Sequence, residues 1–223
     1  MTEAEWLTCT DPQKMLEFLR SNYQTLSVRK LRLFAIACCR SVVYAGTERE
    51  VCEAVDTLEK FTEGTVSQSE LQAACAGAEA VWIAEFGCDY VSATVYEATR
   101  LAATDPFGAV SHASFLASAA ADLRAGRGTK VAELAAQGHW LRDIFPCPFR
   151  PKMVKRSWFT WNEGAVPRMA QGIYDERAFD RLAILADALE DAGCDHADIL
   201  THCRQPADHV RGCWVVDLLL GKQ

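Results

Sequence analysis

The sequence predicts an all-α protein, either a multi-helix bundle or an irregular helical array, with about nine to eleven helices. Apolar residues recur at helical spacing through most of the chain, and caps and stops separate the segments. The alternation of apolar and polar residues that is typical of strands is nearly absent. One proline-rich stretch, near residues 146–162, interrupts this helical pattern.

Composition and charge limit the classes of protein to consider. Of the 223 residues, 50% are hydrophobic and 24% are charged, as in an ordinary globular protein. The net charge of −7 argues against broad binding to nucleic acid. No apolar run reaches the roughly 18 residues of a membrane span, and the acidic N-terminus lacks the basic start of a signal peptide. We therefore expect a cytoplasmic protein whose ten cysteines are reduced thiols.

Helix caps divide the first part of the chain. Asp11 is placed to cap a first helix, and Ser27 a second one that ends near Tyr44. Thr47 with Glu50, and Ser67 with Glu70, both fit the capping-box pattern. We expect one helix from Pro12, one from Ser27, and one after each capping box, ending near 61 and 86. Three further helices are expected at 88–103, 109–125 and 129–145.

Three prolines between Pro146 and Pro151 favour an extended, stiff segment, which we call the strap (146–162). The strap predicts a seam between an N-terminal helical region (1–145) and a C-terminal one (163–223), within one domain or between two. The expected C-terminal helices cover 166–176, 179–192, 197–204 and the apolar stretch from Ala207 onward.

Several segments of the chain resemble an uncharacterised bacterial protein family. The Phe145–Pro148 segment departs from that family, in which similar sequences read Phe-Gly-Asn-Pro. The resemblance implies a bacterial, cytoplasmic protein and brings no activity, ligand or catalytic residue with it. It is carried by residues 2–6, 29–34, 141–145, 148–151, 173–177, 179–181, 184–188, 192–194, 202–204 and 209–222.

A segment rich in cysteine and histidine lies near the C-terminus. Structural zinc sites use four Cys or His ligands, and His209 and Cys213 would share one face of a helix. One hypothesis is therefore a zinc site. The other, which the sequence favours, is that no metal binds, the thiols pack in the core and the histidines are capped or at the surface. The candidate ligands are Cys194, Cys203, His209 and Cys213, with His196 and His202 nearby.

The strap also combines cations with aromatic rings, which suggests a nucleic-acid interface with phosphate contacts and base stacking. The alternative is a crossing segment whose aromatic rings anchor in the core and whose cations stay in water. The net charge favours that alternative, in which Trp158 and Trp161 are at least partly buried. The residues of the possible interface are Arg150, Lys152, Lys155, Arg156, Trp158 and Trp161.

The remaining patterns give no catalytic site. The pair Cys38-Cys39 lies inside an expected helix without a nearby histidine, which favours core packing. The carboxylates between Asp175 and Asp191 alternate with arginines in the manner of a solvated helix face. Gly-rich phosphate loops, Gly-x-Ser-x-Gly and His-Glu-x-x-His are missing. We therefore expect a non-enzymatic helical module that binds another protein; the metalloprotein and nucleic-acid hypotheses remain open alternatives.

Asp217 lies between Val216 and Leu218 in the apolar C-terminal stretch, so we expect it to be buried and paired with an arginine, Arg40 or Arg181. Replacement by alanine would leave the partner's charge buried and should lower the free energy of unfolding by about 3–5 kcal/mol. Thermal denaturation of Asp217→Ala beside the wild type measures this loss. An unchanged melting temperature would contradict the pairing.

Overall fold

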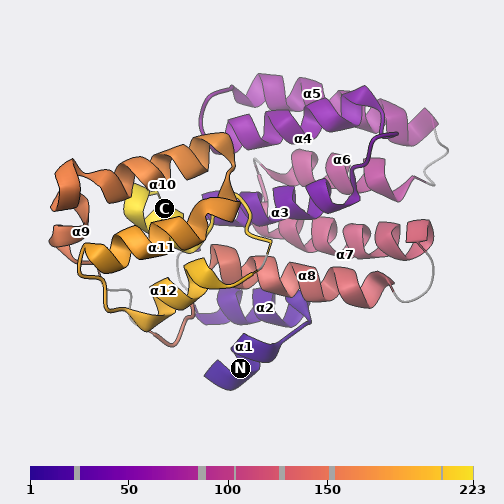
Figure 1. Ribbon diagram of the computed structural model, residues 1–223. Coiled ribbons are helices and arrows are strands. Elements are labelled where there is room, and N and C mark those ends of the chain that lie inside the picture. The colour runs from indigo at the N-terminus through magenta and orange to yellow at the C-terminus, as the bar shows by residue number, and fades with distance from the viewer. Residues whose placement is uncertain are drawn as a thin grey trace. The chain divides into compact units, whose positions relative to one another are not determined.

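The structure is a computed structural model that describes residues 1–22, 26–84, 89–102, 104–125, 129–150, 154–206 and 208–222. These residues form thirteen α-helices, two short 3-10 helices and no strand (Figure 1), which confirms the all-α prediction. The predicted count of nine to eleven is too low, because two short helices were missed. The chain divides into two compact units, unit 1 (Met1–Leu141) and unit 2 (Arg142–Gln223), so the strap belongs to unit 2.

Unit 1 is built around α3 (Val28–Val42), which contacts α4, α6 and α7. Its side chains Phe34, Cys38 and Cys39 are fully buried, as the sequence predicts for the thiol pair. The other helices of unit 1 are α1 (Glu3–Thr8), α2 (Pro12–Asn22), α4 (Arg49–Thr62), α5 (Gln68–Ala84), α6 (Tyr90–Ala102), α7 (Pro106–Ala125) and α8 (Thr129–Ile144), the last of which ends in unit 2.

Three of the four helix caps predicted in unit 1, at Asp11, Ser27 and Ser67, are confirmed. Asp11 Oδ1 accepts the backbone N–H of Gln13 at 3.1 Å, and Ser27 Oγ accepts that of Lys30 at 3.3 Å. Ser67 and Glu70 bond each other's backbone N–H in a complete capping box. The box predicted at Thr47 is wrong.

The helix α4 begins two residues later, at Arg49, and its N-cap is Glu48 without a side-chain cap. Thr47 Oγ1 instead accepts the backbone N–H of Tyr44 at 3.0 Å, within the turn that precedes the helix. The Thr47 hydroxyl therefore bonds the turn before the helix and does not cap α4. The sequence pattern alone does not distinguish a cap from such a turn contact.

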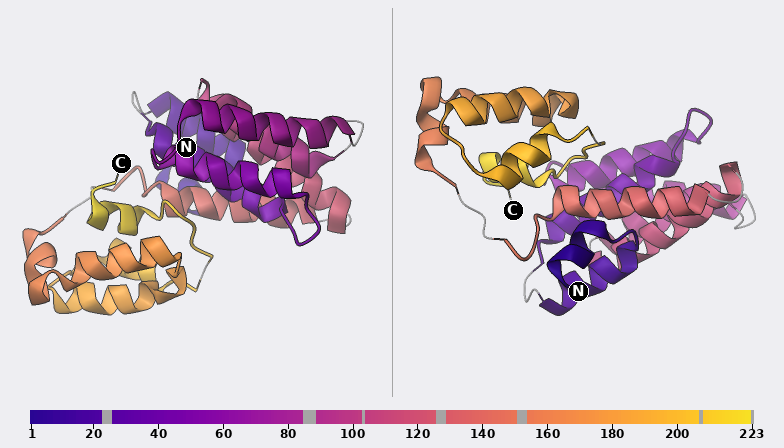
Figure 2. Two further views of the ribbon diagram at one scale, coloured as in Figure 1. Left: turned by 90° about the horizontal axis from the view of Figure 1, so that it is seen from above. Right: turned by 60° about the horizontal axis from the view of Figure 1, so that its bottom comes forward.

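Unit 2 packs its helices around one apolar cluster. Its core includes Trp158, Tyr174, Leu185, Trp214 and Val216. In both views of Figure 2 the helices α10 and α11 lie side by side, and α10 also contacts α13. The helices are α9 (Arg156–Thr160), α10 (Ala165–Glu176), α11 (Leu182–Asp191), α12 (Ala197–Arg204) and α13 (Trp214–Leu220), with 3-10 turns at Trp161–Glu163 and Phe179–Arg181.

The predicted helix from Ala207 onward is wrong in its start, since α13 begins only at Trp214. Residues 210–213 form a tight turn instead, in which Cys213 donates its backbone N–H to the carbonyl of Val210 at 3.0 Å. Gly212, the third residue of the turn, has φ 99°, which a type II turn requires at that position and which favours glycine. The residues just before α13 therefore form a hydrogen-bonded turn and are not part of the helix.

No helix of the described residues combines the length and the apolar character that crossing a lipid bilayer requires. The sequence-based expectation about membrane spans agrees with this finding.

The ion pair of Arg40 with Glu59 connects α3 to α4 in unit 1. Arg40 Nη2 lies 2.6 Å from Glu59 Oε2, whose side chain is only 4% exposed, and 2.9 Å from Asp56 Oδ1. Arg40→Met would leave the Glu59 carboxylate buried without this cation, and should lower the free energy of unfolding by about 1–3 kcal/mol. Urea denaturation followed by circular dichroism measures the loss.

Arg49→Met is the matched control on α4, because the Arg49–Glu53 pair is exposed to water on both sides. We expect it to change stability little, since exposed pairs contribute little. Equal effects of the two substitutions would contradict a structural role for the Arg40 pair.

Candidate metal centre

Four side chains of unit 2 converge on one point. They are Asp143, His202, His209 and Cys213, and one ligand atom from each lies within 4.8 Å of all the others. The side chains of Asp143 and Cys213 are fully buried, and those of His209 and His202 are 3% and 12% exposed. Two imidazoles, a thiol and a carboxylate in such a small buried volume are a ligand set for a transition metal.

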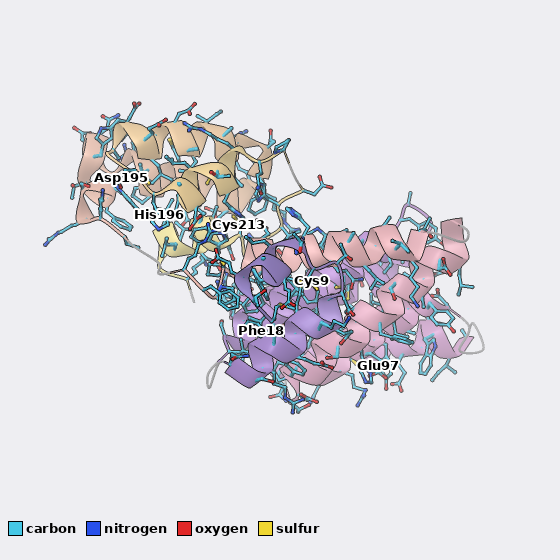
Figure 3. The ribbon with its side chains drawn as sticks, turned by 90° about the horizontal axis from the view of Figure 1, so that it is seen from below. Cys9, Phe18, Glu97, Asp195, His196 and Cys213 are labelled. Atoms are coloured by element: carbon cyan, nitrogen blue, oxygen red, sulfur yellow. The ribbon has the colours of Figure 1, made fainter. Side chains whose placement is uncertain are left out.

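Each of the four comes from a different local structure. Asp143 lies in the last turn of α8, and His202 lies in the last turn of α12. His209 precedes the turn, and Cys213 closes it as the N-cap of α13 (Figure 3 labels Cys213). The tight turn at Gly212, rather than a shared helix face, therefore brings His209 and Cys213 together.

Asp143 is the centre of this group. Its Oδ1 lies 2.6 Å from His209 Nδ1 and 3.0 Å from His202 Nε2. Its Oδ2 accepts the backbone N–H of Val210 at 2.8 Å, an amide that is available because residues 208–210 are not helical. The backbone bond fixes the carboxylate, so that Oδ1 points toward both histidines.

Burial alone would raise the pKa of the Asp143 carboxyl. The hydrogen bonds and the positive charge that His202 and His209 provide outweigh it and lower the pKa to about 2. Asp143 is therefore an anion at neutral pH, ready to bind a cation without first losing a proton.

The thiol of Cys213 behaves in the opposite way. Burial raises its pKa well above the ordinary range, and the negative charge of Asp143 raises it further. Burial and Asp143 also raise the pKa of the neighbouring Cys203 to about 12. A thiol with such a pKa is protonated and a poor nucleophile, whereas a bound divalent metal would convert Cys213 to the thiolate.

The geometry does not match a Cys-His-Asp catalytic relay. Such a relay needs a histidine that contacts the nucleophile through one ring nitrogen and the carboxylate through the other. Here His202 uses Nε2 for both, at 3.3 Å from Cys213 Sγ and 3.0 Å from Asp143 Oδ1. One nitrogen that faces two such atoms fits a hydrogen bond shared between them or an ion that all three groups bind.

The ligand atoms are not spaced as they would be around a bound tetrahedral ion. Bonds of about 2.0–2.3 Å to zinc place neighbouring ligand atoms about 3.3–3.7 Å apart. The separations of 2.6, 3.0 and 3.3 Å, and the largest of 4.8 Å, lie on both sides of that range. These side chains would therefore have to shift to bind one ion together.

The structure brings two of the four predicted zinc ligands into this group and leaves the other two outside it. His209 and Cys213 belong to the group, while Cys194 and Cys203 lie in the apolar core of unit 2. His202 belongs to the Cys/His-rich segment but was not among the four predicted ligands. Asp143, which precedes His209 by 66 positions, was not singled out, because no local spacing connects it to that segment.

The possible nucleic-acid residues of the strap make contacts inside unit 2. Arg150 pairs with Asp198, and Lys155 Nζ lies 2.6 Å from Asp195 Oδ1. Trp158 is 1% exposed, and Trp161 is half-buried against the core, which agrees with the expected anchoring. Arg156 is exposed, and Lys152 lies outside the described residues. Nucleic-acid binding stays a prediction.

Asp217 is 1% exposed in the first turn of α13, so its predicted burial is confirmed. The two arginines suggested as partners bind other carboxylates. Arg40 contacts Asp56 and Glu59, and Arg181 Nη1 lies 2.7 Å from Glu176 Oε2.

No protein-family model, curated protein or solved structure matches this chain. The resemblance to a bacterial family therefore stays a prediction, and the four converging side chains are the feature from which a function can be inferred.

Removal of the Asp143 carboxylate should destabilise unit 2 even when metal has been chelated. In Asp143→Ala, two histidine nitrogens and the Val210 amide lose a buried acceptor, so the free energy of unfolding should fall by about 3 kcal/mol. Chemical denaturation in the presence of EDTA, followed by tryptophan fluorescence, measures the change.

Asp195→Ala provides the control, since this carboxylate is 80% exposed and pairs with Lys155 at the surface. Its unfolding midpoint should match that of the wild type. If Asp143→Ala were equally harmless, Asp143 would not be holding the group together.

Proposed function

We propose that this protein is a metalloprotein whose C-terminal unit binds one divalent transition-metal ion, zinc, through Asp143, His202, His209 and Cys213. The observation that carries the proposal is the convergence of these four side chains within 4.8 Å in a buried position. The metal would join the end of α8 to α12 and the turn before α13, which lie much later in the chain.

Charge balance supports a divalent ion. Asp143 and a deprotonated Cys213 contribute two negative charges, and two neutral imidazoles contribute none. A divalent cation would make the buried group neutral, which avoids the cost of an uncompensated charge in the protein interior. The ligands must lose protons to bind, so metal binding and local folding are coupled.

The ligand types select zinc over the hard cations. Calcium and magnesium prefer oxygen ligands, and only one of these four side chains offers oxygen. A thiolate with two imidazoles and a carboxylate suits a borderline-soft ion with tetrahedral geometry. Iron(II), cobalt(II) and nickel(II) share some of these preferences, so the bound metal is to be identified by elemental analysis.

Four protein ligands make the proposed site closed and structural. A catalytic zinc keeps one position for water or substrate, whereas a structural zinc is enclosed by four protein ligands. Among the four side chains only His202 has a noticeable exposed fraction. The proposal therefore takes up the metalloprotein alternative of the sequence analysis, while the non-enzymatic module that binds another protein stays a prediction.

The test is metal content in protein purified without a histidine tag. We expect about one equivalent of zinc per chain, and a lower melting temperature for unit 2 after chelation, because structural zinc contributes to folding. Elemental analysis and calorimetry with and without EDTA measure both. Cobalt(II) substitution should give the absorption spectrum of a tetrahedral site with a thiolate ligand.

Matched cysteine variants make the test specific to these ligands. Cys213→Ser should lose the metal, whereas Cys194→Ser and Cys203→Ser, at buried positions of the same core, should keep it. Metal retention in Cys213→Ser, or its loss in Cys203→Ser alone, would rule out the proposed ligand set. Untagged wild-type protein that binds no metal would rule out the function.

A further inference from the structure

We infer that metal binding in unit 2 regulates the stability of unit 1, and that α8 transmits the effect. This inference rests on the proposed function, since it requires a metal at Asp143. Its basis is the course of α8, labelled in Figure 1, which runs without interruption from Thr129 to Ile144. The boundary between the units falls after Leu141, so one helix supplies residues to both.

In unit 1, α8 is held by buried polar contacts that we call the Gln137 network. Gln137 is fully buried; its Nε2 donates to Glu133 Oε1 at 2.9 Å and its Oε1 accepts the Ser114 hydroxyl at 2.6 Å. Ser41 on α3 also donates to Glu133 Oε1, at 2.9 Å. The network therefore joins α8 to α3 and α7, and its buried groups are costly to leave without partners.

In unit 2, α8 is held by Asp143 in the metal centre. Asp143 lies six positions after Gln137, which is about 9 Å along the helix and about 120° around it. Asp143 contacts His202, His209 and the backbone N–H of Val210, which gives α8 a buried polar attachment in this unit. The same helix thus has one buried polar attachment in each unit.

A helix transmits an effect between such attachments because it is cooperative. The last turn of a helix leaves carbonyl groups unsatisfied and opens readily, and opening at an end spreads inward along the hydrogen-bond ladder. A metal bound to Asp143 would fix this last turn. The turns that carry Gln137 and Glu133 would then open less often, and the contacts of the Gln137 network would persist longer.

Amide hydrogen exchange of the full chain, resolved by mass spectrometry, tests the inference. Protein stripped with EDTA is compared with the same protein given one equivalent of zinc chloride. We expect zinc to slow exchange about fivefold or more both in residues 142–145 and in residues 131–141, the magnitude of a typical coupling between sites. Exchange in peptides of α7 around Ser114 should also become slower when zinc is added.

The outcomes separate the inference from the proposed function. Stoichiometric zinc binding with slower exchange only from Arg142 onward would overturn the coupling and leave the metal site standing. Failure to bind zinc would overturn both. Magnesium chloride, a hard cation that this ligand set does not suit, should change neither region.

A variant in unit 1 tests the route of the effect. Gln137→Leu removes the amide at the centre of the network and leaves all four metal ligands in place. Zinc should still bind with one equivalent and slow exchange in residues 142–145, but the slowing around Ser114 should disappear. If the slowing around Ser114 remained as large as in the wild type, transmission through the Gln137 network would be wrong.

Discussion

The Asp143 carboxylate joins parts of unit 2 that are far apart in the sequence. It receives a backbone N–H from Val210 and faces the ring nitrogens of His202 and His209 at 3.0 and 2.6 Å. An anion enclosed in the protein interior is tolerated only with such partners. Asp143 therefore helps to position the end of α12 and the turn before α13, beside the apolar packing of these segments.

The sequence predicts the helices of this protein better than it predicts their ends. A helix start is predictable where the capping side chain bonds the backbone of its own helix, as in the pair Ser67 and Glu70. The predicted start at Thr47 is wrong because its hydroxyl accepts a backbone N–H of the preceding turn. The predicted start at Ala207 is wrong because apolar periodicity extends the predicted helix over the turn before α13. Gly212 was the available signal there, because a glycine inside a helical pattern often marks a break.

The candidate site shows the same limit more strongly. Local composition was enough to single out His209 and Cys213, since cysteines and histidines are dense near the C-terminus. It could not select among them, because the choice depends on the turn at Gly212 and on the direction of α12. Asp143 could not be predicted from residue spacing, since only folding brings the end of α8 next to His209.

The chemistry of the group is what distinguishes the proposed metal centre from a packed core. Cys194 and Cys203 are buried among apolar side chains, where a protonated thiol needs nothing further. Cys213 is equally buried but faces an imidazole nitrogen that already faces a carboxylate. Without a metal, the His202 Nε2–H can share a bifurcated hydrogen bond between the two groups, whereas a divalent ion would bind all three and neutralise the two anions. This convergence of two imidazoles, a carboxylate and a thiol is the feature on which the proposed metal centre rests.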